Sequence, residues 1–328
     1  MPPKNSHDVP AIEVKNLTKK YKEVVAVHGL NMKVKKGEIY GFLGPNGAGK
    51  TTTLKIIMGL AKPTAGEVFV EGKKLDAETR RNIGFLPEKV SFYDNLNAIQ
   101  TLEFFAELKN VDKKEIKQIL KEIGLQEAAK RRVGSFSKGM IQLVGIAQTM
   151  LGNPSLYVLD EPMSGLDARW RKYFKDKLKT LNKAGATIIF SSHILAEVED
   201  ICDRVGIIHR GKLVFEGTVL ELHKELNLKP KLEIRIEGLR GNIPDELKGM
   251  EGVEATASDE WLTVLCDYSS RATVMKTLEE KGLRILDFRT SEPSLEESFD
   301  LLLARAEGKN ESAENLCGCE ERICGQFP

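Results

Sequence analysis

Gly44-Pro45-Asn46-Gly47-Ala48-Gly49-Lys50-Thr51-Thr52 is the stretch that decides the fold class of this 328-residue chain. Up to Thr51 it matches the P-loop pattern Gly-x-x-x-x-Gly-Lys-Ser/Thr, with a strand pattern over 38–42 before it and a helical pattern over 54–60 after it. Glycines let backbone N–H groups turn toward phosphate oxygens, Lys50 adds a positive charge near the β- and γ-phosphates, and the Thr51 hydroxyl suits Mg²⁺. The stretch therefore predicts a nucleotide-phosphate site, with a chance glycine-rich loop as the alternative.

A pair of carboxylates downstream is the second chemical signal. Asp160 and Glu161 directly follow the apolar and aromatic run 156–159, which predicts a buried strand. Open α/β sheets bind ligands at the carboxyl ends of their strands. We expect Asp160 to hold Mg²⁺ through its water shell and Glu161 to orient or deprotonate an attacking water. A surface carboxylate is the alternative for Glu161.

Residues 11–226 mix short β-branched runs with amphipathic helices, which predicts a mainly parallel sheet covered by helices. Strands are expected at 12–14, 38–42, 67–70, 83–86, 155–159, 187–190 and 205–208. The strand signal vanishes between 97 and 150, where Asn97 is a candidate helix cap and Asp112 with Glu115 has capping-box spacing. We interpret about 89–150 as an all-helical insertion.

A second, smaller α+β domain is expected over 231–306. A capping box at 218–221 opens the last helix of the first domain, and 227–230 breaks the pattern. Strands at 232–236, 253–257, 261–266 and 283–288, with helices near 244–248 and at 271–281, give the order β-α-β-β-α-β of a ferredoxin-like fold. Ser294 and Glu297 predict the cap of a closing helix that ends near 306.

Composition limits the partners and the location. Lys and Arg number 49 and Asp and Glu 48, so the net charge of +1 predicts no nucleic-acid partner. The tail 1–10 has no apolar signal-peptide core, and we expect the protein to stay in the cytosol. The uncharged stretch 139–159 is long enough to cross a bilayer, but Gln142, Gln148 and the turn at 152–154 predict a buried helix and strand instead.

The five cysteines fall into two groups. Cys202 and Cys266 stand alone in apolar surroundings and are expected in the core. Cys317, Cys319 and Cys324 lie in the polar tail 307–328, which we expect to be disordered. Three thiols are an alternative metal site, although structural zinc usually takes four ligands and no histidine lies near them.

The order of these motifs resembles that of ABC ATPases, a P-loop NTPase family, from residue 12 to about 226. The element similar to the family signature Leu-Ser-Gly-Gly-Gln is Phe136-Ser137-Lys138-Gly139-Met140. Its lysine and methionine depart from the family pattern, and Leu143 stands where arginine is common, which resembles the drug- and ion-exporter branch. Ser137 and Gly139 would present a hydroxyl and an N–H at a helix start, an anion site. The resemblance implies that this site meets the γ-phosphate of ATP on another subunit.

Three further elements carry the resemblance. Ser164-Gly165-Leu166-Asp167 resembles the D-loop that crosses the dimer interface, and Asp167 alternatively serves only as a helix cap. His193 follows the strand pattern 187–190 at the position of the family's switch histidine, which contacts the γ-phosphate and orders the attacking water. Tyr21 falls where the family keeps an aromatic residue that stacks on adenine, with an ordinary exposed tyrosine as the alternative.

Glu88 stands where the family usually has a glutamine that reaches Mg²⁺ and senses the membrane partner. Glutamate is able to do both, with a more pH-dependent metal contact. Phe92, Tyr93 and Leu96 follow in a loop where relatives receive a coupling helix from the transmembrane subunit, and local packing is the alternative. The segment 294–299 resembles the accessory domain of the same exporter branch.

The resemblance implies an ATP-hydrolysing subunit that forms a dimer with itself or a close paralogue around two ATP. It would drive a separate transmembrane permease, as an exporter, from the cytoplasmic face of the membrane. A soluble ABC ATPase without a membrane partner is the alternative, although long coiled-coil insertions and a second ATPase domain are absent from the sequence. A non-hydrolysing binder is disfavoured because Lys50, Asp160, Glu161 and His193 are all present.

Overall fold

The computed structural model describes residues 9–267 and 269–308, and these form two compact units divided after Thr218. The three tail cysteines, Cys317, Cys319 and Cys324, lie outside the described residues. Among the described residues the first unit has two sheets and the second unit has one, and each unit has its own hydrophobic core.

The first unit contains a six-stranded sheet that positions the predicted chemistry. Its strands, in spatial order, are β5 (Ile83–Leu86), β6 (Leu156–Asp160), β7 (Thr187–Ser192), β3 (Ile39–Leu43), β8 (Arg204–His209) and β9 (Lys212–Gly217). All neighbours pair in parallel except β9, which is antiparallel to β8. β3, β6 and β7 are buried at every position, as their continuous apolar runs predict for a sheet covered on both faces.

A separate antiparallel sheet lies in the same unit, in the order β2 (Val24–Val34), β1 (Ile12–Tyr21), β4 (Ala65–Val70). The strand expected at 12–14 is longer in the structure, because β1 continues to Tyr21, and β2, which follows it directly, was not expected. β9 was also missed. Register shifts in the β1–β2 ladder interrupt the alternation of buried and exposed residues that identifies a strand in sequence.

Helices connect the strands of the larger sheet. α1 (Lys50–Ile57) follows β3, and its Leu54 and Ile57 pack in one core with Phe42 and Val158. α2 (Ala77–Arg81) precedes β5, α6 (Ala168–Lys183) joins β6 to β7, and α7 (Leu195–Glu199) follows β7.

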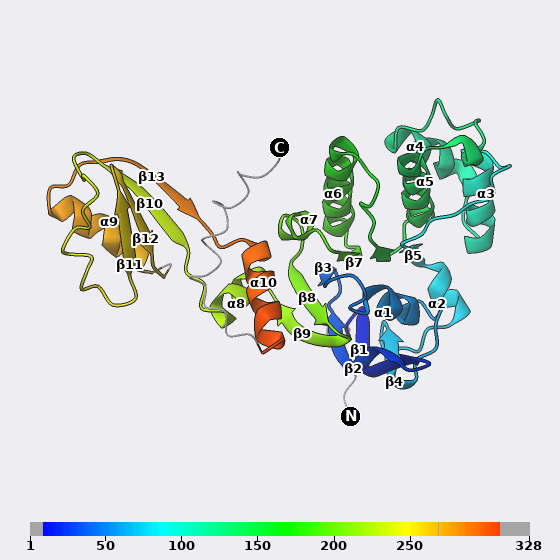
Figure 1. Ribbon diagram of the computed structural model, residues 1–328. Coiled ribbons are helices and arrows are strands. Elements are labelled where there is room, and N and C mark those ends of the chain that lie inside the picture. The colour runs from blue at the N-terminus through cyan, green and yellow to red at the C-terminus, as the bar shows by residue number, and fades with distance from the viewer. Residues whose placement is uncertain (1–8, 268, 309–328) are drawn as a thin grey trace, which may run out of the picture. The chain divides into compact units, whose positions relative to one another are not determined.

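The described chain between β5 and β6 is helical throughout its regular structure. It forms α3 (Ala98–Lys109), α4 (Ile116–Glu122) and α5 (Lys138–Met150), with 3-10 turns at Lys113–Glu115 and Val133–Ser135. α3, α4 and α5 lie together, and α5 also packs on β5 (Figure 1). Asn97 caps α3 in a capping box with Gln100, so the predicted start of this helix is confirmed. The stretch 139–159 divides into α5 and β6 as predicted, and within the described residues no helix is both long and apolar enough to span a membrane.

The second unit has a four-stranded antiparallel sheet in the order β11 (Glu254–Ser258), β12 (Trp261–Leu265), β10 (Lys231–Ile236), β13 (Ile285–Ser291). α9 (Ser270–Glu280) contributes Val274 and Leu278 to the core beneath it. The helix expected near 244–248 is replaced by turns, because Pro244 and the glycines at 238, 241, 249 and 252 leave no room for a stable helix.

α8 (Val219–Glu225) belongs to the second unit, although the sequence assigned it to the first. It packs with α10 (Leu295–Ala306), whose Arg305 donates hydrogen bonds to the backbone carbonyls of Glu225 and Leu226. The cap predicted for α10 is confirmed: Ser294 and Glu297 form a capping box.

Candidate nucleotide site

The loop between β3 and α1 has a conformation that glycine favours. Gly47 and Gly49 have φ of 80° and 112°, in the left-handed region. A Cβ on Gly49 would lie 2.5 Å from the carbonyl oxygen of Ala26, so a side chain does not fit there. The Lys50 ammonium folds back over the loop and donates hydrogen bonds to the carbonyl oxygens of Gly44 at 2.5 Å and Pro45 at 3.3 Å.

A cavity of about 380 Å³ opens above this loop. It is lined by Ala26, Pro45, Asn46, Gly47, Ala48, Gly49, Lys50, Thr51, Thr52, Glu88, Glu161, Ser164 and His193. The structure therefore brings the phosphate loop together with residues that are distant in sequence and come from the ends of three other strands. Burial lowers the pKa of Lys50, while the nearby Glu161 carboxylate acts in the opposite direction.

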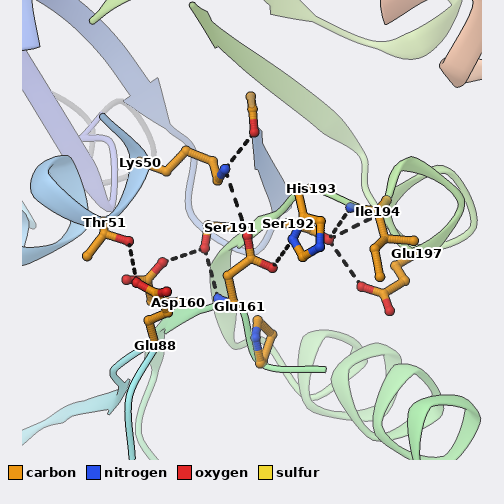
Figure 2. A network of polar contacts seen from close by, with 12 residues as sticks. Lys50, Thr51, Glu88, Asp160, Glu161, Ser191, Ser192, His193, Ile194 and Glu197 are labelled. Carbon is orange, nitrogen blue, oxygen red and sulfur yellow. Dashed lines mark hydrogen bonds and ion pairs between the residues drawn. The ribbon is translucent and has the colours of Figure 1, made fainter. Parts of the chain in front are cut away.

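Asp160 lies at the end of β6 and is nearly fully buried. Ser191, its partner in the register of β7, donates a hydrogen bond from Oγ to Asp160 Oδ1 at 2.6 Å (Figure 2). Burial raises the pKa of Asp160, and the hydrogen bonds from the Ser191 and Thr51 hydroxyls oppose this shift. The Thr51 hydroxyl also lies 3.3 Å from Glu88 Oε2, so Thr51 links both carboxylates.

Glu161 stands between a cation and a histidine. Its Oε1 is 3.8 Å from Lys50 Nζ, and its Oε2 is 2.8 Å from His193 Nδ1 (Figure 2). Its φ is 48°, a conformation uncommon for glutamate, and its backbone N–H donates to Ser191 Oγ at 2.9 Å. Burial raises the pKa of Glu161, and the His193 hydrogen bond lowers it. A carboxylate with a raised pKa, facing the cavity, is suited to accept a proton from water.

The oxygens of Thr51, Glu88 and Asp160 are the hard ligands that Mg²⁺ prefers. The described residues contain no group of three or more His, Cys, Asp or Glu side chains that could hold a metal ion by themselves. Mg²⁺ usually takes only one or two carboxylates and completes its shell with water and phosphate oxygens. This donor set therefore fits Mg²⁺ that is bound together with a nucleotide.

The remaining predicted site residues do not line the cavity. Ser137 caps α5, and its Oγ accepts a hydrogen bond from the Met140 N–H, whereas Asp167 caps α6 by accepting from the Trp170 N–H. A Cβ on Gly139 would lie 3.1 Å from the Gly165 carbonyl oxygen, so the signature-like segment packs against the loop 164–167.

Tyr21 is 46% exposed at the end of β1 and does not line the cavity either. The Lys19 ammonium lies 4.6 Å from the centre of its ring. The Tyr21 ring is thus accessible, and adenine stacking stays a prediction.

Ser191 was missed by sequence reasoning, although its hydroxyl contacts the Asp160 carboxylate and the backbone N–H of Glu161. The sequence signal that could have identified Ser191 is its position, two residues before His193 at the end of a predicted strand. Only the register between β6 and β7 shows that Ser191 lies opposite Asp160.

Comparison with known proteins gives a consistent result. A family model described as ABC transporter matches residues 27–164. The bacitracin transport ATP-binding protein BcrA of Bacillus licheniformis is 37% identical over 297 residues, which cover 89% of this chain and 97% of that protein. The linearmycin resistance ATP-binding protein LnrL of Bacillus subtilis (strain 168) is 30% identical, over 90% of this chain and 98% of that protein.

Solved structures agree with these relatives. An ATP-binding subunit of an ABC transporter is 32% identical with a TM-score of 0.63, and the match covers 66% of this chain and 93% of that one. A dimeric post-hydrolysis state of the ATP-binding cassette MJ0796 bound to ADP and Pi is 28% identical with a TM-score of 0.60, over 63% of this chain and 98% of that one. Together with the phosphate loop and the paired carboxylates, these matches show that the chain belongs to the family of ABC transporter ATP-binding subunits.

Proposed function

We propose that this chain binds and hydrolyses ATP as the motor subunit of an ABC exporter, dimerises around two ATP and drives a separate membrane permease from the cytoplasmic face. The observation that carries the proposal is the placement of Glu161 between Lys50 and His193, beside the phosphate loop. A base, a cation and a histidine there face the position that a γ-phosphate would take.

In this mechanism the loop N–H groups and Lys50 bind the phosphates. Thr51, Glu88 and Asp160 would hold Mg²⁺, which when bound neutralises charge on the β- and γ-phosphate oxygens. Glu161 accepts a proton from water as the water oxygen bonds to the γ-phosphorus and the bond from that phosphorus to the bridging oxygen breaks, releasing ADP. His193 holds the Glu161 carboxylate through Nδ1 and orients it toward the water.

The dimer part of the proposal rests on residues that lie outside the cavity. Ser137 and Gly139 stand at the amino end of α5, where backbone N–H groups favour an anion, yet neither lines the cavity of its own chain. A phosphate held by a second chain fits that position. The ATP-binding cassette MJ0796, which this chain resembles, is dimeric in its solved structure.

An apolar cavity of about 540 Å³ supports the permease part. Its walls come from the end of β5, the loop after it and α3, and they include Phe85, Val90, Phe92, Phe105 and Leu108. Arg80, Lys89 and Lys109 add positive charge, and burial lowers the pKa of Lys109 to about 8. An amphipathic helix with an acidic residue fits such a groove. Export follows by analogy with relatives named for bacitracin transport and linearmycin resistance.

The Glu161→Gln variant tests the motor. Because it keeps the shape of the side chain and loses the base, we expect ATP binding to persist while kcat falls at least 100-fold, as loss of a general base commonly produces. The variant should accumulate as an ATP-dependent dimer in size-exclusion chromatography, with the wild type as the matched control. A wild-type turnover rate would exclude Glu161 as the base.

The Leu108→Glu variant tests the groove. Leu108 is exposed on α3, so the added charge should leave the fold and the ATPase activity of the purified chain intact. We expect it to lose the integral membrane protein that the wild-type chain captures from detergent-solubilised membranes. Leu286→Glu, at an exposed apolar residue of β13, is the control and should retain it. Equal capture by both variants would contradict the assignment of the groove.

A further inference from the structure

The backbone that carries His193 is held by a buried carboxylate on the next helix. Ser192 is 1% exposed, and its hydroxyl lies 3.1 Å from Oε2 of Glu197, which is 8% exposed (Figure 2). The same hydroxyl accepts a hydrogen bond from the Ile194 N–H at 3.0 Å. Glu197 thereby holds, through one hydroxyl, the backbone on both sides of His193. The carboxylate is the strongest acceptor near that hydroxyl.

The second oxygen of Glu197 faces Arg171 on α6. Within the part of the chain that the structure describes, Glu197 Oε1 accepts no hydrogen bond, and it lies 3.9 Å from Arg171 Nη1. A buried carboxylate oxygen without a donor is unfavourable, and a shift of about 1 Å would bring this pair to the distance of a charge-assisted hydrogen bond. A small movement would therefore convert the Arg171–Glu197 ion pair into a direct hydrogen bond.

Arg171 also contacts the loop 164–167. Its Nε donates a hydrogen bond to the carbonyl oxygen of Leu166 at 2.9 Å. A movement of that loop therefore moves the guanidinium that faces Glu197. The continuous path is Leu166, Arg171, Glu197, Ser192, His193 and Glu161.

We propose that Glu197 is a positioning residue for His193, and that Arg171 makes its position respond to the loop 164–167. The inference rests on the proposed function, in which this loop meets the second subunit and His193 orients Glu161. Closure of the dimer would move the loop, tighten the Arg171–Glu197 pair and hold His193 Nδ1 in the contact that it makes with Glu161. The network thus couples assembly of the dimer to hydrolysis in the same chain.

A double-mutant comparison tests the positioning role. We expect Glu197→Ala to lower kcat about tenfold. The KM for ATP should change by less than about twofold, because the substitution leaves the phosphate loop unchanged. In a His193→Ala background the same substitution should lower kcat no further, since a residue that acts through His193 has nothing left to position. Glu199→Ala, at an exposed carboxylate on the same helix, is the matched control and should match the wild type.

Ser192→Ala keeps the test decisive if Glu197→Ala fails to fold. This small substitution removes the link and leaves Glu197 facing Arg171, so kcat should fall in the wild-type background and remain unchanged in the His193→Ala background. Glu197→Gln retains an acceptor for Ser192 but loses the charge that Arg171 requires, so an intermediate loss of about threefold is expected.

Three results separate the inference from the function on which it rests. Equal losses of kcat from Ser192→Ala or Glu197→Ala in both backgrounds would indicate a structural role and overturn the inference. A slow His193→Ala variant with an unaffected Glu197→Ala variant would also overturn it and leave the proposed function intact. A His193→Ala variant with the wild-type rate would instead refute the role of His193 in the proposed function.

Discussion

The acid–base behaviour of Glu161 depends on opposing effects within a few ångströms. Burial raises the pKa of its carboxyl group above the ordinary 4.5, while the hydrogen bond to His193 and the charge of Lys50 lower it. A general base works best when its pKa approaches the working pH and its carboxylate is ionised. The surroundings of Glu161 therefore make it a stronger base than a solvent-exposed glutamate, and His193 limits that gain.

The pH dependence of hydrolysis should report this balance. Because the proposed base Glu161 would act in its ionised form, kcat should fall as the pH decreases through its pKa, with a midpoint above 4.5. His193→Ala removes a contact that lowers this pKa, so the midpoint should move to higher pH even though the rate is lower. The measurement is kcat at saturating Mg-ATP across the range in which circular dichroism shows the fold to be intact. An unchanged midpoint in His193→Ala would contradict the direct contact.

Sequence reasoning at the residue scale identified the residues that carry charge and missed those that orient them. Asp160, Glu161 and His193 follow predicted strands, so their place at one sheet edge was predictable. Ser191 and Glu197 carry no motif, and their contacts arise from the pairing of β6 with β7 and from the position of α7.

At the scale of elements, the β3–α1 turn depends on the close approach of β2. The carbonyl oxygen of Ala26 on β2 occupies the space that a side chain at Gly49 would need. The P-loop motif predicted the glycine but not this neighbour, because β2 itself was not predicted. That antiparallel sheet could not be predicted from the sequence pattern, because β1 is rich in lysine and its register with β2 is interrupted.

The Gly49→Ala substitution should therefore do more than strain one residue. Its φ of 112° and the contact at 2.5 Å together should cost more than about 1 kcal/mol of unfolding free energy and displace the phosphate loop. We expect a lower thermal midpoint and at least tenfold weaker ATP binding. Gly185→Ala is the control, because Gly185 has a φ of 100° with open space around its Cβ position. Equal ATP affinity in the two variants would show that Ala26 does not constrain the loop.

At the scale of the whole molecule, the proposed dimer would complete the cavity of each chain with residues of the other chain. The phosphate loop, Glu161 and His193 line it, whereas Ser137 and Gly139 stand elsewhere on the surface of the same unit. A composite site formed by two chains would unite them. A site shared by two chains predicts that two different inactive variants can restore activity when they are mixed, whereas a site within one chain does not.

Mixing two inactive variants tests the composite site. Lys50→Ala removes the phosphate lysine, and Ser137→Arg blocks the signature-like helix start, so each homodimer should be inactive. A mixed dimer contains one site with both defects and one site with neither. Mixing equal amounts should therefore restore about a quarter of the wild-type rate if partners pair at random and the sites act independently. No recovery in a mixture shown to exchange subunits would contradict the shared site.

The sequence by itself determined the chemistry and the larger architecture, because the phosphate loop, the acidic strand end and the histidine strand end are local patterns with a direct physical meaning. The tertiary structure alone decided the β1–β2–β4 sheet, the assignment of α8 to the second unit and the loss of the helix near 244–248. It also decided what surrounds Glu161. Burial, strand register and contacts between distant segments set the pKa and the orientation of that carboxylate, and none of these is a property of neighbouring residues in the chain.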